Sequence, residues 1–106
     1  MKNTGNIFSN IPNNLPEEIF ETILSILILS FDIIVSKGQS SPKNFWYDQD
    51  QNEWVIVLEG KARLVFKGNE TINLNKGDYI NIPAHKKHRV EWTDPDVETI
   101  WLAIYY

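Results

Sequence analysis

EWVIVLE, residues 53–59, is the stretch of the sequence that decides the fold. Side chains of a β-strand point alternately to its two faces, so Glu53 would share a face with Val55 and Val57. The tryptophan, isoleucine and leucine between them would occupy the other face. Apolar residues on both faces indicate a strand between a barrel interior and a second layer. The carboxylate of Glu53 would then need a partner or a cation, because burying an unpaired charge is costly.

Short strands separated by turn residues continue on both sides of this stretch. We expect them at 26–36, 45–49, 61–67, 70–74, 78–82, 88–93 and 98–105. Glycine, asparagine, aspartate and proline occupy the intervening turns, and no helical pattern interrupts the series after residue 38. This spacing predicts an all-β protein built as an antiparallel sandwich or barrel.

The residues before these strands have a different pattern. Residues 1–14 are rich in asparagine and predict an irregular arm. A capping asparagine, a proline in the first turn and two glutamates near the start predict a short helix over about 16–25. We therefore divide the chain into an N-terminal arm with a short helix, residues 1–25, and one β-barrel domain, residues 26–106.

The composition argues against several classes of function. A net charge of -4 lacks the positive field that attracts phosphate backbones, so we expect no nucleic-acid partner. The absence of cysteine excludes disulfides, thiolate metal ligands and a cysteine nucleophile. The most apolar run, residues 23–35, is interrupted by polar residues and falls short of the roughly 20 apolar residues of a membrane-spanning helix. We expect a cytoplasmic protein that binds no membrane, and the start of the chain does not resemble a secretory signal.

Catalytic patterns built on a nucleophile or a bound nucleotide are also missing. The sequence contains no G-x-S-x-G, P-loop or G-x-G-x-x-G pattern. Acyl transfer and nucleotide hydrolysis are therefore poorly supported.

IPAHKKHRVEWT, residues 82–93, contains both histidines of the chain. The alternation rule puts His88, Val90 and Trp92 on one face of a strand, with the charged residues between them on the solvent side. His88 is therefore predicted to point inward, toward Glu53. A neutral nitrogen donor and a carboxylate in an apolar cavity are typical of a small-molecule or metal site.

Each of these residues also has a purely structural interpretation. His88 would be a buried histidine that donates to a backbone carbonyl. Glu53 would form a salt bridge with Arg63 or Lys61 at the rim of a barrel. His85 is expected at the rim in either case, where it could shuttle protons near neutral pH.

Two segments, in the correct order, resemble the two sequence motifs of the cupin superfamily. They are EWVIVLEG, residues 53–60, and GDYINIPAHKKHRVEW, residues 77–92. The acidic residue and glycine of the first motif, and the glycine, proline and histidine of the second, fall on Glu53, Gly60, Gly77, Pro83 and His88. The chain departs from the second motif at His85, which replaces a glycine, and at Trp92, which replaces an asparagine. The resemblance covers residues 38–106 and implies a small single-domain cupin of the cupin-2 type, a jelly-roll barrel or double-stranded β-helix.

The resemblance also implies a set of metal ligands. In metal-binding cupins two histidines, a glutamate and a later histidine hold a divalent ion such as iron, manganese, nickel or zinc. Carried over position by position, these ligands fall on Tyr47, Gln49, Glu53 and His88. A motif spacing longer by one residue would put the two histidines on Trp46 and Asp48, but the shorter spacing keeps the ligands on the same face as Glu53. A glutamine carbonyl is a weak ligand and a tyrosine phenol must lose its proton to bind strongly, so metal affinity should fall below that of a three-histidine site. A weak oxygen-rich metal site and a metal-free cavity both remain open.

Three functions follow from the resemblance. The first is a metal- or small-ligand-binding site inside the barrel. If the protein is an enzyme, this implies oxygenation, isomerisation or decarboxylation of a small molecule, with Glu53 and His88 holding a metal or exchanging a proton and Tyr47 donating a hydrogen bond or a proton. The second, favoured by the substitutions at 47 and 49, is a non-catalytic, metal-free barrel that binds or senses a small molecule. The third is a structural role as a homodimer, because cupins often pair by exchanging an N-terminal strand.

Overall fold

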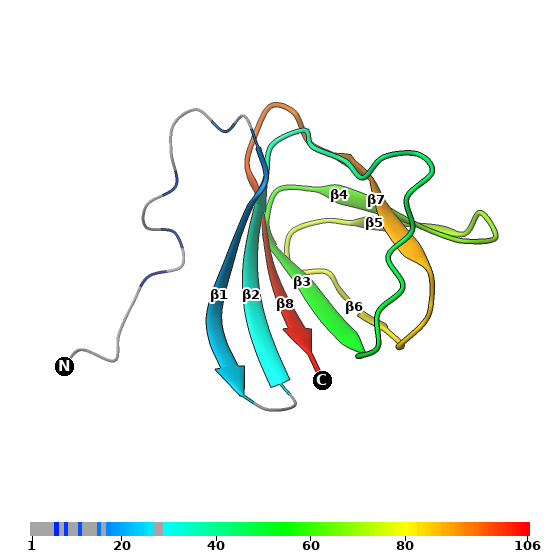
Figure 1. The fold of residues 1–106 in the computed structure, drawn as a ribbon. Coiled ribbons are helices and arrows are strands. Elements are labelled where there is room, and N and C mark those ends of the chain that lie inside the picture. Colours follow the sequence, from blue (N-terminus) through cyan, green and yellow to red (C-terminus); the bar gives the residue numbers. More distant parts are fainter. Residues whose placement is uncertain (1–5, 7, 9–10, 12–14, 16, 27–28) are drawn as a thin grey trace.

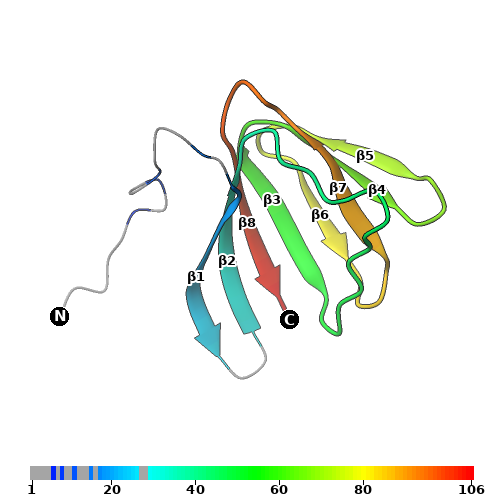
Figure 2. The same cartoon turned by 45° about the horizontal axis from the view of Figure 1, so that its top comes forward.

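Eight strands form two antiparallel sheets. The computed structural model describes residues 6, 8, 11, 15, 17–26 and 29–106. The strands are β1 (Ile19–Ile26), β2 (Leu29–Ser36), β3 (Glu53–Glu59), β4 (Ala62–Phe66), β5 (Thr71–Leu74), β6 (Tyr79–Ile82), β7 (His88–Thr93) and β8 (Thr99–Tyr105). The larger sheet has the order β1-β2-β8-β3-β6 and the smaller has the order β5-β4-β7, and the two face each other in Figures 1 and 2. The predicted all-β architecture is confirmed.

The helix predicted over residues 16–25 is wrong. Residues 19–26 form β1, which pairs with β2 from Ile19 opposite Val35 to Ile26 opposite Leu29. The sequence of β1, IFETILSI, contains four β-branched residues, which favour a strand over a helix. This pairing adds β1 to the edge of the larger sheet and outweighs the helix-start signals, which are local and weak.

The structure describes only part of the predicted N-terminal segment, residues 1–25. The expected arm, residues 1–14, lies mostly outside the described residues, and so does residue 16 at the start of the expected helix. The expected boundary at residue 25 falls inside β1, so the first strand belongs to the same sheet as β2 and β8.

The strand predicted over residues 45–49 is reduced to a single bridging residue. Tyr47 forms an isolated antiparallel bridge with His88. Its N–H donates to the His88 carbonyl at 2.7 Å, and the Gln49 carbonyl accepts from the His85 N–H at 2.8 Å. These bonds fix the loop between β2 and β3 against the start of β7. The other predicted strands are confirmed, with small shifts at their ends.

The alternation predicted for β3 is confirmed. Glu53, Val55 and Val57 are 8%, 2% and 0% exposed, whereas the residues between them are half-buried on the outer face. The valines join a core that both sheets contribute to, and its other buried members include Leu64, Phe66, Ile82, Trp101 and Ala103. The face of β3 that carries Glu53 is therefore the face that looks into the barrel.

The alternation predicted for β7 is wrong at Trp92. His88 is buried, but the register shifts so that Leu64 pairs with Val90 while Arg63 pairs with Trp92. The residue between them on β7 is a β-bulge, which reverses the side-chain order beyond it. The Trp92 ring is consequently exposed and lies under the Arg63 guanidinium, 5.7 Å from it.

The glycine of the first motif has a steric explanation. Gly60 has a φ of 85°, in the left-handed region that favours glycine. A Cβ there would lie 2.6 Å from the Thr99 Cα and 2.7 Å from the Glu98 carbonyl oxygen. The turn between β3 and β4 therefore needs glycine for both backbone conformation and space.

A second apolar cluster forms apart from the main core. Ile33, Val35 and Ile100, from β2 and β8, pack with Leu15 and with the half-buried Ile11. Residues before β1 therefore contribute to burying the larger sheet. Within the described part of the chain, no helix has the length and apolar character needed to cross a membrane.

Candidate functional site

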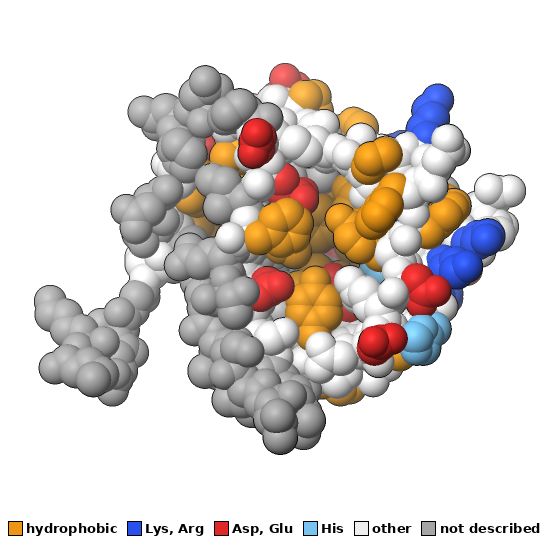
Figure 3. Space-filling view, viewed as in Figure 1, with side chains coloured by type: hydrophobic (Ala, Val, Ile, Leu, Met, Phe, Trp, Pro, Cys, Tyr) orange, Lys and Arg blue, Asp and Glu red, His pale blue; other side chains and the backbone are white. Residues whose placement is uncertain are grey.

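A cavity of about 70 Å³ lies between the two sheets. It is large enough for a few water-sized groups. Apolar side chains and several carboxylates gather around a hollow on the face shown in Figure 3. All four residues that the resemblance implies as metal ligands, Tyr47, Gln49, Glu53 and His88, line this cavity. Mostly apolar walls with a few polar groups are typical of small-molecule sites.

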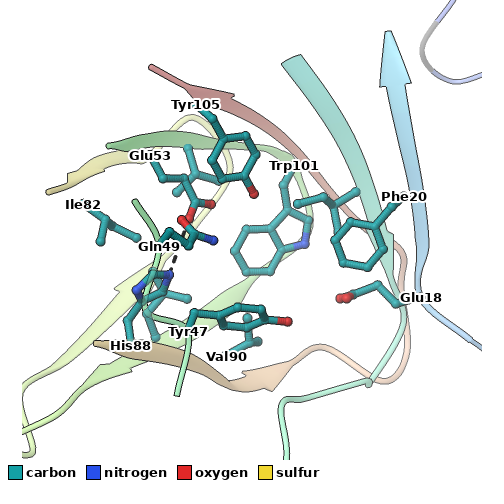
Figure 4. Close-up of a pocket in the computed structure, with 13 residues that line it drawn as sticks. Glu18, Phe20, Tyr47, Gln49, Glu53, Ile82, His88, Val90, Trp101 and Tyr105 are labelled. Carbon is teal, nitrogen blue, oxygen red and sulfur yellow. Dashed lines mark ion pairs between the residues drawn. The ribbon is translucent and has the colours of Figure 1, made fainter. Parts of the chain in front are cut away.

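Glu53 and His88 face each other across the cavity. Glu53 is the first residue of β3 in the larger sheet, and His88 is the first residue of β7 in the smaller sheet. The distance from the Glu53 Oε1 to the His88 Nε2 is 3.4 Å, and both side chains are at most 10% exposed (Figure 4). The two sheets thus bring together residues that are far apart in the sequence. Arg63, an alternative partner for Glu53, instead donates to the Asn73 side chain at 2.9 Å.

A backbone contact fixes the tautomer of His88. The His88 Nδ1 lies 2.9 Å from the Lys86 carbonyl oxygen. A carbonyl oxygen can only accept, so Nδ1 must carry a hydrogen and donate it. In the neutral ring Nε2 then has a lone pair, and this lone pair faces the Glu53 carboxylate. Two acceptors at this distance need a proton, a ligand donor or a cation between them.

The pKa of His88 is raised above its usual value. Burial is the largest single influence and lowers the pKa. The hydrogen bond with Glu53, the hydrogen bond with the Lys86 carbonyl and the negative charge of Glu53 together outweigh burial. The pair therefore favours a proton on Nε2 when nothing else occupies the gap.

Tyr47 lies beside His88 and does not direct its hydroxyl at it. The two rings stack with centroids 5.7 Å apart and planes 29° apart. Figure 4 shows the Tyr47 hydroxyl on the side of the cavity where Glu18 lies. Burial raises the pKa of the phenol, the charges of Glu18 and Glu53 raise it further, and a hydrogen bond with Ser41 lowers it. Tyr47 therefore keeps its proton and can donate a hydrogen bond.

Gln49 lines the cavity together with Glu53 and Tyr105, and all three are labelled in Figure 4. Burial strongly raises the pKa of Tyr105, and the charges of Glu53 and Asp32 add to this effect, while a hydrogen bond with Gln49 lowers the pKa. Tyr105 is therefore a second neutral phenol in the cavity. The Gln49 side chain forms a hydrogen bond with this phenol and also lines the cavity.

The site residues inferred from the sequence do not include Glu18, Trp101 and Tyr105, which also line the cavity. The alternation rule, applied to β8, could have found the last two, because both lie on the same face of the strand. Glu18 precedes β1, and only the β1–β2 hairpin brings it to the cavity. A local reading of the sequence places it in a helix start and gives no signal for this position.

His85 lies outside the cavity, in the position expected for a rim residue. Its side chain is exposed, with Nδ1 2.9 Å from the Asp48 carboxylate and Nε2 3.7 Å from the Asp50 carboxylate. Its φ of 65° lies in the left-handed region. A positive φ is unfavourable for most residues and costs glycine nothing. This explains why the second cupin motif has a glycine at the position of His85.

The donor set fits a tightly held divalent ion poorly. His88 offers a free Nε2 and Glu53 offers a carboxylate, and both are good ligands. Tyr47 is a protonated phenol with its hydroxyl turned elsewhere, and Gln49 offers only an amide oxygen. Among the described residues, no group of three or more His, Cys, Asp or Glu side chains could hold a metal ion. Zinc usually takes three or four protein ligands, so two strong donors are too few.

Comparisons with known proteins identify the family. The family model for the cupin domain matches residues 31–105. The chain therefore belongs to the cupin family, and its two sheets form the cupin jelly-roll barrel. A search of curated proteins finds no significant match.

One solved structure is similar over nearly the whole chain. It is a candidate mannose-6-phosphate isomerase from Ralstonia eutropha JMP134, with 41% identity and a TM-score of 0.92 over 98% of this chain and 97% of that one.

Two further solved structures share the fold at lower identity. A cupin superfamily protein from Desulfitobacterium hafniense DCB-2 has 18% identity and a TM-score of 0.74, over 90% of this chain and 82% of that one. The DMSP lyase DddQ from Ruegeria pomeroyi DSS-3 has 16% identity and a TM-score of 0.70, over 83% of this chain and 46% of that one.

Proposed function

We propose that this cupin binds a small polar molecule directly in the cavity between its sheets, with Glu53 and His88 as the polar anchor. The observation that carries the proposal is the 3.4 Å gap between a buried carboxylate and a buried imidazole whose other nitrogen is already used. A ligand hydroxyl beside the pair, about 2.8 Å from each of the two atoms, can bridge them, because it donates to the carboxylate and accepts from a protonated Nε2. The apolar walls would hold the carbon skeleton of the ligand.

The charge of the cavity favours a ligand without phosphate or carboxylate groups. Glu18 and Glu53 both line the cavity, and no lysine or arginine is found among its described lining residues. A phosphate group would meet two carboxylates, and among the described lining residues only His88 can carry a positive charge, which it already shares with Glu53, so phosphate binding is unfavourable in a low-dielectric site. The similar Ralstonia protein is described as acting on a sugar phosphate, so this chain would differ from that description in the charge of its ligand.

A proton-transfer activity is a second candidate function. The Glu53–His88 pair can hold one proton in a dry cavity, which is the requirement for general acid–base catalysis. In an isomerisation of a hydroxy-carbonyl compound, the base removes a proton from the hydroxyl-bearing carbon beside the carbonyl and returns it to the former carbonyl carbon, while the hydroxyl proton passes to the former carbonyl oxygen. The likeness to a candidate isomerase supports this reaction class.

Metal binding by Tyr47, Gln49, Glu53 and His88 remains a prediction, and elemental analysis separates it from direct ligand binding. Protein purified without chelators is expected to contain divalent metal well below one equivalent per chain. Stoichiometric metal in the wild-type protein that is lost in both Glu53→Gln and His88→Asn would contradict direct binding and support a metal centre.

Ligand binding itself is tested by NMR with the full chain and a panel of small alcohols, hydroxy-aldehydes and unphosphorylated sugars. Binding is expected to shift signals of cavity residues and to weaken in Glu53→Gln and His88→Asn. The matched controls are Glu91→Gln and His85→Asn, because both wild-type residues are exposed and lie outside the cavity. Equal effects of the cavity variants and the controls would overturn the proposal. For any compound of the panel that binds, exchange of its carbon-bound hydrogen for deuterium in D₂O would reveal the proton-transfer activity.

A further inference from the structure

The cavity has a second polar end, separate from the Glu53–His88 pair. Figure 4 shows Glu18, Phe20 and the nitrogen-bearing edge of Trp101 on the opposite side of the cavity, with the Tyr47 hydroxyl turned toward them. Glu18 lies in the segment before β1, and its carboxylate accepts a hydrogen bond from the fully buried Ser36 hydroxyl. We call Glu18, Phe20 and Trp101 the Glu18 end.

Trp101 contributes a donor that has no partner among the described residues. The residue is 3% exposed, and its indole Nε1 is buried without a hydrogen bond to any group that the structure describes. Buried donors in folded proteins are nearly always paired, because an unmade hydrogen bond costs folding free energy. The nitrogen-bearing edge of the ring faces the Glu18 side of the cavity (Figure 4). An acceptor supplied by a ligand would satisfy this donor.

The chemistry of the Glu18 end selects one kind of group. The Trp101 N–H can only donate, and the Glu18 carboxylate, when ionised, can only accept. A hydroxyl group accepts from the first and donates to the second. A carbonyl group would accept from Trp101 but could not donate to Glu18, which would keep only its bond from Ser36, and a phosphate or carboxylate would face the negative charge of Glu18. Phe20 is 57% exposed and lies on the edge strand β1. Its side chain therefore has room to rotate when a ligand enters the cavity.

We propose that Glu18 and Trp101 form a hydroxyl-recognition subsite, so that the cavity takes a neutral molecule with hydroxyl groups at both ends, a polyol or an unphosphorylated sugar. This inference rests on the proposed function, because the same cavity binds the ligand. It adds a specificity determinant that the cupin motifs do not contain. Glu18 and Phe20 precede the part of the chain that matches the cupin domain, residues 31–105.

The test is NMR titration of the full chain with glycerol and mannose, followed on the indole N–H signals of its four tryptophans. Loss of one signal in Trp101→Phe assigns the Trp101 N–H, and Trp92→Phe is the matched control because its ring is exposed. The Trp101 signal is expected to shift on addition of at least one of these two compounds. Mannose 6-phosphate is expected to bind at least tenfold more weakly than mannose.

Matched acidic variants test the role of Glu18. Glu18→Ala is expected to weaken binding about tenfold or more, since it removes a hydrogen bond to a charged group. Glu17→Ala is the control, because Glu17 is the exposed neighbour of Glu18. If Glu18→Ala does not fold, Glu18→Gln keeps an acceptor for Ser36 and removes the charge, and the same weakening relative to Glu17→Gln is expected.

The outcomes separate this inference from the function on which it rests. Binding that weakens in His88→Asn, with no change in Glu18→Ala and no shift of the Trp101 signal, overturns the subsite and leaves the proposed function intact. Binding of carbonyl or anionic compounds in place of glycerol and mannose overturns the hydroxyl specificity. Failure of every compound in the panel to bind overturns both.

Discussion

The Nδ1–H of His88 donates to the Lys86 carbonyl, and this one contact determines what the other nitrogen of the ring presents to Glu53. A histidine that was free to flip could turn either nitrogen toward the cavity. With Nδ1 held, Nε2 always faces the carboxylate, and the pair can hold one proton, one ligand hydroxyl or one cation. The structural interpretation of His88 as a donor to a backbone carbonyl therefore agrees with its place in the site, because the backbone contact orients the ring.

Glu53→Gln is expected to lower the pKa of His88. In the wild-type protein, the charge and hydrogen bond of Glu53 help to outweigh the opposing effect of burial. A neutral amide removes the charge and leaves burial less opposed. NMR titration of the histidine ring signals measures this pKa directly, and the exposed His85 serves as an internal control. A His88 pKa that is unchanged or higher in the variant would contradict the role assigned to the carboxylate.

The sequence predicts those parts of the site that depend on the regular alternation of a strand. Glu53 precedes two inward valines on β3 without interruption, so its orientation follows from counting. His88 is the first residue of β7 and lies before the bulge, so counting also works there. Trp92 lies beyond the bulge, and the same rule fails. Nothing in the residues of β7 marks the extra residue, because the bulge is set by its pairing with β4.

The parts of the site that could not be predicted depend on pairing between distant segments. Glu18 reaches the cavity because β1 pairs with β2, and the local sequence signals at this point favour a helix start. The sequence pattern predicts a strand at Tyr47 and Gln49, whereas a bridge to His88 and a bond to His85 hold them in a loop. In each case a tertiary contact outweighs the local preference.

The homodimer implied by the cupin resemblance stays a prediction, and β1 is the element through which we expect it to form. β1 is an edge strand of the larger sheet, with β2 as its one neighbour among the described strands. An unpaired edge can accept a strand from a second copy. Sedimentation of the full chain is expected to give the mass of a dimer. Removal of residues 1–25 is expected to give a monomer, and retention of the dimer by the shortened chain would rule out a role for β1.

Gly60→Ala is expected to destabilise the protein more than Gly77→Ala does, by about 2 kcal/mol or more. Both glycines have nearly the same φ, 85° and 88°, so the backbone strain of the two substitutions is similar. They differ in space, because a Cβ at Gly60 meets the backbone of Glu98 and Thr99, while a Cβ at Gly77 has, apart from its chain neighbours, no atom of the described residues within 4 Å. Urea denaturation of both variants measures the difference. Equal losses of stability would show that conformation alone explains the glycine in the first motif.

Glu18 is expected to make the folded protein less stable as the pH rises from acid toward neutral. Burial raises the pKa of Glu18, against a hydrogen bond from Ser36 that lowers it, so the folded-state pKa lies above the unfolded value of 4.5. Below that value both states are protonated and the contribution of Glu18 to stability is fully present. The contribution is lost as the pH rises through the folded-state pKa, because the folded protein must then bury a charge.

Comparison of Glu18→Gln with the wild-type protein isolates this effect from the other carboxylates. The free energy of unfolding of Glu18→Gln, relative to that of the wild type, is expected to increase between pH 4.5 and neutral pH. Glu17→Gln, which alters the exposed neighbour, is expected to show no such trend. A relative stability of Glu18→Gln that stays constant over this range, or falls, would mean that the carboxylate is ionised in the folded protein without cost. A ligand that donates a hydroxyl to Glu18 is expected to favour the ionised form and so to reduce the difference between Glu18→Gln and the wild type.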